Sequence, residues 1–469
     1  MTRRTPQSAA ALFGFRDSSA EIFRCGSRSY RARDLIRDAS ELADRITPFA
    51  RQRVIVPSDE PFAAVCGVVG CWMADATLVL WRRSAIAVDA LASLTSASAI
   101  AEREAAGGRW RVEPAGSSQP TIEAPGDVVI MTSGSTGQPK GVALDLCRAL
   151  NNAALAGSRL DIDETSFWTV DADMSLISPF GHTLMAWCYQ KPACHLTGMD
   201  WKERSALFAR APGGFGGTPL QLREFAQRLD GEGPRVLVSS GDFLMPSLGQ
   251  SVADRFPDSR LHKVYGLTEV SGRLCVLRHE QRQIDPEPAG YPLPGFAVTI
   301  AHADADDEVG EVCASGPTMM LGYWRAGRGF EPQNAEPFRT GDLGRMADDG
   351  LITLQGRLDD VFKVGAEKVD RHSIEKALQP LLKGCEFCVL PVLHPAFGQT
   401  PALFVAANDR TALPPRGALI QAIRRELPSR FVPSLMLWSG AGLPRLLNGK
   451  VDHQRLIGNC RTLPDLYDV

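Results

Sequence analysis

The chain has 469 residues, more than the roughly 100–200 residues of a usual domain, so we expect at least two domains. Apolar residues make up 44% and charged residues 22%, which is typical of folded globular proteins and excludes disordered, fibrous and membrane classes. The formal charge of −3 leaves no overall basic field for nucleic acid or an anionic membrane, so an anionic ligand needs a local site.

The N-terminal region and the cysteines indicate a cytoplasmic protein. Arg16 and Asp17 interrupt the first apolar residues too early for a signal-peptide core. Eleven cysteines are scattered singly, as expected for reduced thiols in a reducing compartment. Cys385 and Cys388 form the only Cys-x-x-Cys, and without a second pair at zinc spacing they favour packed thiols over a metal site.

Helical and strand patterns alternate in the first part of the chain. Apolar residues recur at helical spacing in 30–46. The most apolar stretch, 62–80, is interrupted by Asp75 and two glycines, which favours a buried helix and then a strand at 77–81 over a membrane span. Further short strands are expected at 54–56, 128–131, 236–238 and 263–264. This alternation predicts an α/β architecture, in which ligands bind at the ends of strands. The Ala/Ser/Glu/Gly-rich stretch 90–118 is interpreted as a variable surface region.

The pattern changes after Pro286. Short strands separated by Gly, Asp and Pro turns predict a small antiparallel β subdomain, at 298–300, 311–314 and 351–354. A helix–strand–strand–helix series then predicts a small α+β domain, at 373–382, 387–393, 403–406 and 416–427. We therefore expect an N-terminal domain, 1–355, and a C-terminal domain, 356–469.

The sharpest local feature is a strand that runs from Val128 into a loop of glycines and hydroxyl residues and closes with Pro139-Lys140-Gly141. Such a loop offers backbone N–H groups and hydroxyls to a polyphosphate, and the lysine adds a point charge. It is not a Walker loop, because Pro139 replaces the second glycine and no Ser or Thr follows Lys140. A flexible surface loop is the alternative, but Gly/Ser linkers rarely follow a β-branched strand or end in Pro-Lys-Gly.

This loop resembles the signature of the AMP-forming adenylate-forming superfamily, which includes acyl- and aryl-CoA synthetases, nonribosomal peptide adenylation domains and luciferases. Further segments in the same order carry the resemblance: Tyr265-Gly-Leu-Thr-Glu269, Arg339-Thr-Gly-Asp-Leu343, Gly356-Arg-Leu-Asp-Asp360, and Pro444-Arg445 with Asn448-Gly-Lys450. Weaker similarity covers Gly290–Trp324. The likeness extends over nearly the whole chain from about Glu21.

The resemblance implies a role for each of these residues. The leaving β- and γ-phosphates of ATP would be held by the phosphate loop, through Thr132, Ser133, Gly134, Ser135, Thr136, Gly137 and Lys140. Thr268 would contact the α-phosphate, Glu269 would hold Mg²⁺, and Tyr265 would lie against adenine, which Gly241 and Asp242 also reach. Asp342 would bind the ribose hydroxyls with Arg357 nearby, Lys450 would be the catalytic lysine, and Asp359 would be the hinge. The domain 1–355 would thus bind ATP and the acid, and the mobile domain 356–469 would carry the catalytic lysine. Each of these residues alone could be an ordinary surface or turn residue. Because the motifs occur together in the order of the family, we favour an ATP-binding site.

The acid is expected to bind near Ser178–His182. Amino-acid-activating members begin this segment with an aspartate that pairs with the substrate ammonium, and no aspartate stands there, so a non-amino acid is favoured. His182 is either a pocket residue or a buried core histidine. Gly213–Gly217 would leave room for a flat ring, or mark ordinary turns. Gly217 and Gly266 complete the predicted pocket, and the substrate is expected to be a small aromatic or similarly compact acid.

The expected activity is an acid:thiol ligase. The acid and ATP give acyl-AMP and pyrophosphate, and a thiol of CoA or of carrier-protein phosphopantetheine then displaces AMP. The alternatives are an amine acceptor, an oxygenase-type relative, a medium- or long-chain fatty acid substrate, or a catalytically silent nucleotide-binding partner, which the intact motifs disfavour. Departures at Ala366, Leu446, Leu447 and His453 make thioester formation less strongly supported than adenylation. A carrier protein is the expected protein partner, with no nucleic acid or membrane.

Overall fold

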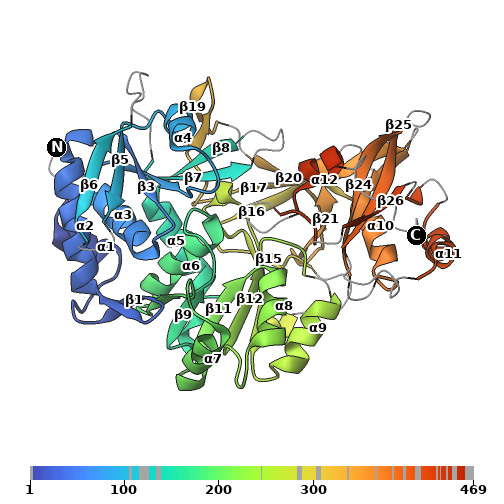
Figure 1. The fold of residues 1–469 in the computed structure, drawn as a ribbon, viewed down its shortest axis with the longest axis horizontal. Helices are drawn as coiled ribbons and strands as arrows, with labels where there is room; N and C mark the ends of the chain where they lie inside the picture. Colours follow the sequence, from blue (N-terminus) through green and yellow to red (C-terminus); the bar gives the residue numbers. More distant parts are fainter. Residues whose placement is uncertain are drawn as a thin grey trace. The chain divides into compact units, whose positions relative to one another are not determined.

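A computed structural model of the protein describes most of the chain. The described residues are 4–104, 108–115, 126–133, 139–244, 246–281, 288–302, 308–334, 337–364, 367–382, 385–394, 398–406, 414–428, 431–433, 435–439, 442–445 and 451–459. The chain divides into two compact units (Figure 1). The first unit comprises Met1–Thr299, Cys313–Phe338 and Met346–Thr353. The second comprises Ile300–Val312, Arg339–Arg345 and Leu354–Val469.

A nine-stranded sheet of the first unit has the order β15-β14-β13-β12-β11-β9-β10-β1-β2. Its strands are β1 (Glu21–Cys25), β2 (Arg28–Arg31), β9 (Phe167–Val170), β10 (Ala193–His195), β11 (Gly213–Gly217), β12 (Val236–Ser240), β13 (Arg260–Tyr265), β14 (Cys275–Leu277) and β15 (Tyr291–Pro292). The six strands from β13 to β1 in that order run parallel. Their carboxyl ends therefore share one edge, the usual place for a ligand.

A second sheet of this unit has eight strands in the order β19-β18-β8-β7-β4-β3-β5-β6. These are β3 (Arg53–Pro57), β4 (Thr77–Trp81), β5 (Ala99–Arg103), β6 (Trp110–Pro114), β7 (Val128–Ser133), β8 (Pro139–Leu144), β18 (Gly322–Arg325) and β19 (Gly329–Pro332). The phosphate segment lies between β7 and β8, which pair antiparallel with Thr132 opposite Lys140. The sequence predicted β7 but not β8.

Helices of the first unit are α1 (Pro6–Leu12), α2 (Ala32–Ile46), α3 (Pro61–Met73), α4 (Val88–Thr95), α5 (Leu146–Gly157), α6 (Ile177–Cys188), α7 (Trp201–Arg210), α8 (Pro219–Arg228) and α9 (Pro246–Arg255). Short 3₁₀ turns are η1 (Thr47–Phe49), η2 (Ile162–Glu164), η3 (Thr268–Val270) and η4 (His279–Gln281). In α3 every residue except Trp72 is buried, so the most apolar stretch of the sequence is a core helix followed by β4, as predicted. Among the described residues, no helix has the length and hydropathy to cross a bilayer.

The interpretation of 90–118 as a variable surface region was wrong for its described part. This stretch contributes α4, β5 and β6, and its Leu91, Ala97 and Trp110 side chains are buried. Trp110 donates its indole N–H to the carbonyl of Asp38 in α2. A stretch rich in small residues such as alanine suggested a surface region, but here these residues allow close packing between layers.

The remaining strands include the β-rich segment predicted after Pro286. β16 (Ala297–Ala301), β17 (Gly310–Ser315), β20 (Phe338–Met346) and β21 (Ile352–Arg357) form a sheet in that order. A last sheet has the order β23-β22-β25-β24, with β26 beside β25. Its strands are β22 (Val361–Val364), β23 (Glu367–Asp370), β24 (Glu386–His394), β25 (Gly398–Ala406) and β26 (Leu435–Ser439), preceded by η5 (Leu358–Asp360).

Three helices accompany the last sheet: α10 (Arg371–Leu378), α11 (Arg416–Glu426) and α12 (His453–Asn459). Ile374 and Leu378 of α10 and Leu419 and Ile423 of α11 pack in one core with sheet residues. The predicted helix 373–382 ends at Leu378 instead, because Pro380 disfavours helical backbone at the residue before it.

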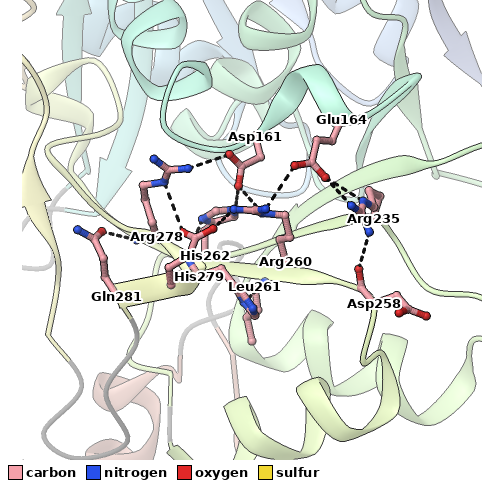
Figure 2. A network of polar contacts seen from close by, with 11 residues as sticks. Asp161, Glu164, Arg235, Asp258, Arg260, Leu261, His262, Arg278, His279 and Gln281 are labelled. Carbon is pink, nitrogen blue, oxygen red and sulfur yellow. Dashed lines mark hydrogen bonds and ion pairs between the residues drawn. The ribbon is translucent and has the colours of Figure 1, made fainter.

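A network of partly exposed charged residues lies at the amino ends of β12 and β13 (Figure 2). Asp161 lies 2.6 Å from Arg260 at the start of β13, 3.1 Å from Arg278 and 3.0 Å from the Nε2 atom of His262. Glu164 binds Arg235 at 2.8 Å just before β12. This network lies at the opposite ends of the strands from the signature loops, so we interpret it as structural.

Candidate active site

Four of the predicted segments form the end of a parallel strand of the nine-stranded sheet or follow it, at β9, β11, β12 and β13. They therefore lie at one edge of the sheet. The register pairs Gly217 of β11 with Ser239 of β12, and Ser240 with Val264 of β13. Gly241 turns the chain after β12 with a φ of +84°, a left-handed conformation that favours glycine. Asp242 is exposed and its carboxylate accepts the N–H of Phe243. Tyr265 ends β13 and is buried.

The phosphate hairpin meets the loop after β13 at Glu269. The Lys140 ammonium lies 2.9 Å from the Oε1 atom of Glu269, although 129 residues separate the two. The Tyr323 hydroxyl of β18 donates to the same oxygen at 2.9 Å, and the Lys140 ammonium lies 4.0 Å from the Tyr323 ring centroid. Burial and the Glu269 charge raise the pKa of Tyr323, so this hydroxyl stays a donor. Glu269 is only 8% exposed, and its pairing satisfies an otherwise costly buried carboxylate.

Asn152 of α5 holds the loop that carries Thr268 and Glu269. Its side chain is fully buried, and its amide donates to the carbonyls of Val270 and Arg273 at 3.1 and 2.7 Å. Its Oδ1 atom accepts the N–H of Arg273 at 3.0 Å. Thr318 donates to the Val270 carbonyl at 2.9 Å and so braces the same turn. Asn152 is a positioning residue that the sequence analysis did not find.

His182 lies inside α6 with its ring stacked on Trp168, 5.5 Å between centroids. Burial and the nearby Arg273 charge hold its pKa well below the usual value, so the ring is neutral at neutral pH. Its Nδ1 atom is buried and has no hydrogen-bond partner among the described residues. Ser178, which begins the predicted acid-binding segment, has its hydroxyl 3.2 Å from the Ser240 hydroxyl.

The glycines of β11 make room for rings of this chain itself. A Cβ at Gly214 would lie 2.3 Å from Trp168, and one at Gly216 would lie 2.2 Å from His182. A Cβ at Gly217 would lie 2.8 Å from the Phe215 ring. The expectation that these glycines leave space for a flat substrate is therefore wrong in its physical reason.

Arg273 is a buried cation beside the acid segment. It is 3% exposed, and both terminal guanidinium nitrogens lack a hydrogen-bond partner among the described residues. A Cβ on Gly181 of α6 would lie 1.9 Å from its Nη1 atom, so a side chain at this position would displace the guanidinium. Burial lowers the pKa of Arg273 to about 10, which leaves it charged at neutral pH.

In the second unit, two predicted ribose-binding residues contact each other. Arg357, at the end of β21, lies 3.3 Å from the buried carboxylate of Asp342 in β20. Next to the predicted hinge residue Asp359, whose side chain lies outside the described part, Asp360 lies 3.3 Å from Arg371. Arg371 in turn lies 2.9 Å from His453 of α12.

A comparison with protein families identifies the family of this chain. The profile of the family described as "AMP-binding enzyme" matches residues 82–324, slightly more than half of the chain. The chain belongs to this family. It is thus an adenylate-forming enzyme, and the predicted resemblance to that superfamily is confirmed.

Curated relatives of this AMP-binding enzyme are distant. The beta-alanyl-bioamine nonribosomal peptide synthetase ebony of Drosophila melanogaster is 28% identical over 71% of this chain and 42% of its own length. The D-alanine–D-alanyl carrier protein ligase of Streptococcus pyogenes serotype M5 is 24% identical over 70% of each chain. The chain therefore spans less than half of the first relative.

Solved structures share the fold over nearly the whole chain. The o-succinylbenzoate coenzyme A synthetase MenE of Bacillus subtilis, in complex with AMP, has a TM-score of 0.79 at 16% identity, over 96% of this chain and 97% of its own. ATP-bound MatB of Rhodopseudomonas palustris has a TM-score of 0.80 at 18% identity, over 96% and 98%. The predicted mixed α/β class is confirmed.

The Glu269 site fits the Mg²⁺ expected in this family. Mg²⁺ takes one or two protein carboxylates together with phosphate oxygens and water. Only the Oε1 atom of Glu269 carries contacts from Lys140 and Tyr323; no hydrogen bond or ion pair within the described part of the chain engages Oε2. A MenE complex with ATP and magnesium ion is known for Bacillus subtilis.

Some predicted residues cannot be placed. Thr132, the residue before the last one of β7, has its hydroxyl buried and without a partner among the described residues, while only the backbone of Ser133 is described. The rest of the predicted set lies outside the described residues: Gly134, Ser135, Thr136, Gly137 and Lys450. Tyr323 was missed, although it stands in the Gly-Tyr-Trp end of the weakly similar segment. Nothing in the local sequence marked Asn152 or Arg273.

Proposed function

We propose that the protein converts a carboxylic acid and ATP to acyl-AMP and pyrophosphate, and then passes the acyl group to a thiol of CoA or of carrier-protein phosphopantetheine. The observation that supports this most is the Lys140–Glu269–Tyr323 contact. It brings the phosphate hairpin and the Tyr-Gly-x-Thr-Glu loop to one point. A lysine for the departing phosphates and a carboxylate for Mg²⁺ are both needed where negative charge accumulates.

The two steps balance without another reactant. A carboxylate oxygen forms a bond to the α-phosphorus, and the bond from that phosphorus to the bridging oxygen breaks as pyrophosphate leaves. The thiolate sulfur then attacks the acyl carbon, and AMP departs with the electron pair of the carbon–oxygen bond. In this proposal Lys140 and Thr132 stabilise the leaving phosphates, Thr268 donates to the α-phosphate, and Lys450 bridges the α-phosphate and the carboxylate.

The proposed acid carries no amino group and is compact. Ser178 provides no charge for an ammonium, and the buried Arg273 cation would repel one. The first expectation, a small aromatic acid, is one such compact acid. Because ebony and the D-alanyl ligase carry amino acids in their names, free amino acids are the direct comparison in the experiment.

The rest of the predicted arrangement stays part of the proposal. Asp342 and Arg357 would bind ribose, Tyr265, Gly241 and Asp242 adenine, and residues 356–469 would move about Asp359. Ten described cysteines have free thiols, which supports a location in the reducing cytoplasm. The acceptor is CoA or a carrier protein.

Acid-dependent exchange of labelled pyrophosphate into ATP tests the activation step. The panel contains aromatic acids, short diacids, C8–C16 fatty acids and free amino acids, and the acceptors are CoA, a phosphopantetheinylated carrier protein and an amine. We expect exchange with at least one non-amino acid and a loss of about 10²-fold or more in Lys450→Ala. Lys202→Ala, at an exposed lysine of α7, is the matched control. Exchange unaffected by Lys450→Ala, or absent for the whole panel, contradicts the proposal.

A further inference from the structure

Arg273 is a buried cation whose terminal nitrogens have no hydrogen-bond partner among the described residues. An ionised side chain that is removed from water must be paired, or its burial costs several kcal/mol. The guanidinium is 3% exposed, and neither terminal nitrogen has an acceptor among the described residues. Its pKa of about 10 keeps it a cation at neutral pH.

Two titratable side chains near Arg273 within the described part of the chain, Cys188 and His182, supply no negative charge. Burial raises the pKa of the Cys188 thiol to about 11, so this neighbour is neutral at pH 7. His182 has its pKa held low by burial and by Arg273 itself, so it is neutral as well. Asn152 binds only the backbone of Arg273.

A second buried arginine shows what a satisfied site looks like in this chain. Arg53 is 1% exposed, and burial also lowers its pKa to about 10. Its guanidinium donates twice to the carbonyl of Ser96, at 2.9 and 3.1 Å, and lies 4.6 Å from the Trp324 ring centroid. Arg273 is buried to a similar degree, but its terminal nitrogens have no such contacts among the described residues, so a ligand anion would supply the missing partner.

The position of Arg273 indicates which part of a ligand would pair with its guanidinium. Its guanidinium lies against Gly181, one residue before His182 in the proposed acid-binding segment. The loop from Tyr265 closes on itself, since Gly272 donates to the Leu267 carbonyl and Leu274 to the Tyr265 carbonyl. Thr268, proposed to contact the α-phosphate, and Arg273 therefore belong to one closed loop.

We infer that Arg273 binds a second carboxylate on the acid, so that the substrate is a compact dicarboxylic acid of which one carboxylate is adenylated and the other pairs with this guanidinium. The inference rests on the proposed function. A bidentate guanidinium–carboxylate pair in a dry site discriminates strongly, because a monoacid of the same size leaves the buried cation unpaired.

The experiment compares matched acids in pyrophosphate exchange. The probes are the saturated diacids from three to eight carbons with their monoacids, and the three benzenedicarboxylates with benzoate. For the wild-type protein we expect kcat/KM to be at least about 30-fold higher for the best diacid than for its monoacid. In Arg273→Met that ratio should fall to near one, and in Arg273→Lys to an intermediate value, because a point charge pairs less well than a planar fork.

Thermal unfolding of the free protein separates a ligand-binding role from a structural one. Arg273→Met removes an unpaired buried charge and should raise Tm, whereas Arg53→Met breaks satisfied contacts and should lower it. A wild-type preference for monoacids in every pair, or an Arg273→Met variant that loses both members of a pair equally, overturns the inference. Exchange with non-amino monoacids alone sinks only this inference, whereas no exchange with any acid sinks the proposed function.

Discussion

Gly266 makes the tightest backbone contact in the loop after β13. A Cβ there would lie 1.8 Å from the Gly272 carbonyl oxygen and 2.8 Å from the Arg273 Cα, and backbone atoms cannot move aside cheaply. We expect Gly266→Ala to destabilise the protein by about 1–3 kcal/mol, the usual cost of overpacking, and to slow adenylation by displacing Thr268. Chemical denaturation and pyrophosphate exchange measure the two effects.

Gly417 of α11 is the matched control, because a Cβ there meets no atom within 4 Å. Gly417→Ala should stabilise its helix by about 0.5–1 kcal/mol. If Gly266→Ala leaves both unfolding and exchange unchanged, the packing of the loop is not as described.

At the scale of elements, α5 positions the catalytic loop through one side chain. Asn152→Ala removes the bonds to Val270 and Arg273 and leaves the buried N–H and carbonyl of Arg273 without this partner. We therefore expect the free energy of unfolding to fall by about 2–4 kcal/mol and the KM for ATP to rise. Asn151→Ala changes the neighbouring exposed residue of the same helix and should have little effect. A KM for ATP equal in both variants would contradict the positioning role.

The charge network at the start of β13 makes stability depend on pH. His262 accepts the N–H of His279 at Nδ1, and its Nε2 atom lies 3.0 Å from Asp161. Burial lowers the pKa of His262 to about 4, with Arg260, His279 and Arg278 also lowering it and Asp161 opposing. The unfolded chain binds this proton near pH 6.5, so the contribution is complete above 6.5 and is lost as pH falls toward 4.

The size of this effect is on the order of 3 kcal/mol, since each pKa unit corresponds to about 1.4 kcal/mol. Urea unfolding between pH 4 and 7 should show a shallower pH dependence in His262→Gln than in the wild type. His302→Gln, at an exposed histidine, serves as the control and should keep the wild-type slope. Equal slopes for all three proteins would show that His262 does not stay neutral in the fold.

Short-range patterns were enough to predict the strands and helices that bury a regular apolar face, such as β4 and α11. They were not enough for β8, because its pairing with β7 across the phosphate segment is a tertiary contact. The loops around Glu269 and Gly241 carry motifs and could be assigned by resemblance. Asn152 and Arg273 could not, since an ordinary amide and an ordinary arginine acquire their roles only when distant elements bury them.

At the scale of the whole molecule, two reactions at one site require the C-terminal domain to present two faces, so we expect Asp359 to act as a hinge. Asp359→Pro fixes φ and should leave pyrophosphate exchange largely intact while slowing thioester formation. Asp359→Ala keeps the backbone free and is the control. Loss of exchange with normal thioester formation from supplied acyl-AMP would show that the boundary is misplaced.

The route of oxygen from the acid to AMP tests acyl-AMP formation most directly. The acid that gives the fastest exchange is labelled with ¹⁸O in its carboxylates and incubated with ATP, Mg²⁺ and a thiol acceptor. The masses of AMP and pyrophosphate are then measured by mass spectrometry. Because a carboxylate oxygen bonds to the α-phosphorus and stays there when the thiol attacks, AMP should gain one ¹⁸O atom and pyrophosphate none. Unlabelled AMP, or label in pyrophosphate or orthophosphate, would contradict activation through an acyl-adenylate.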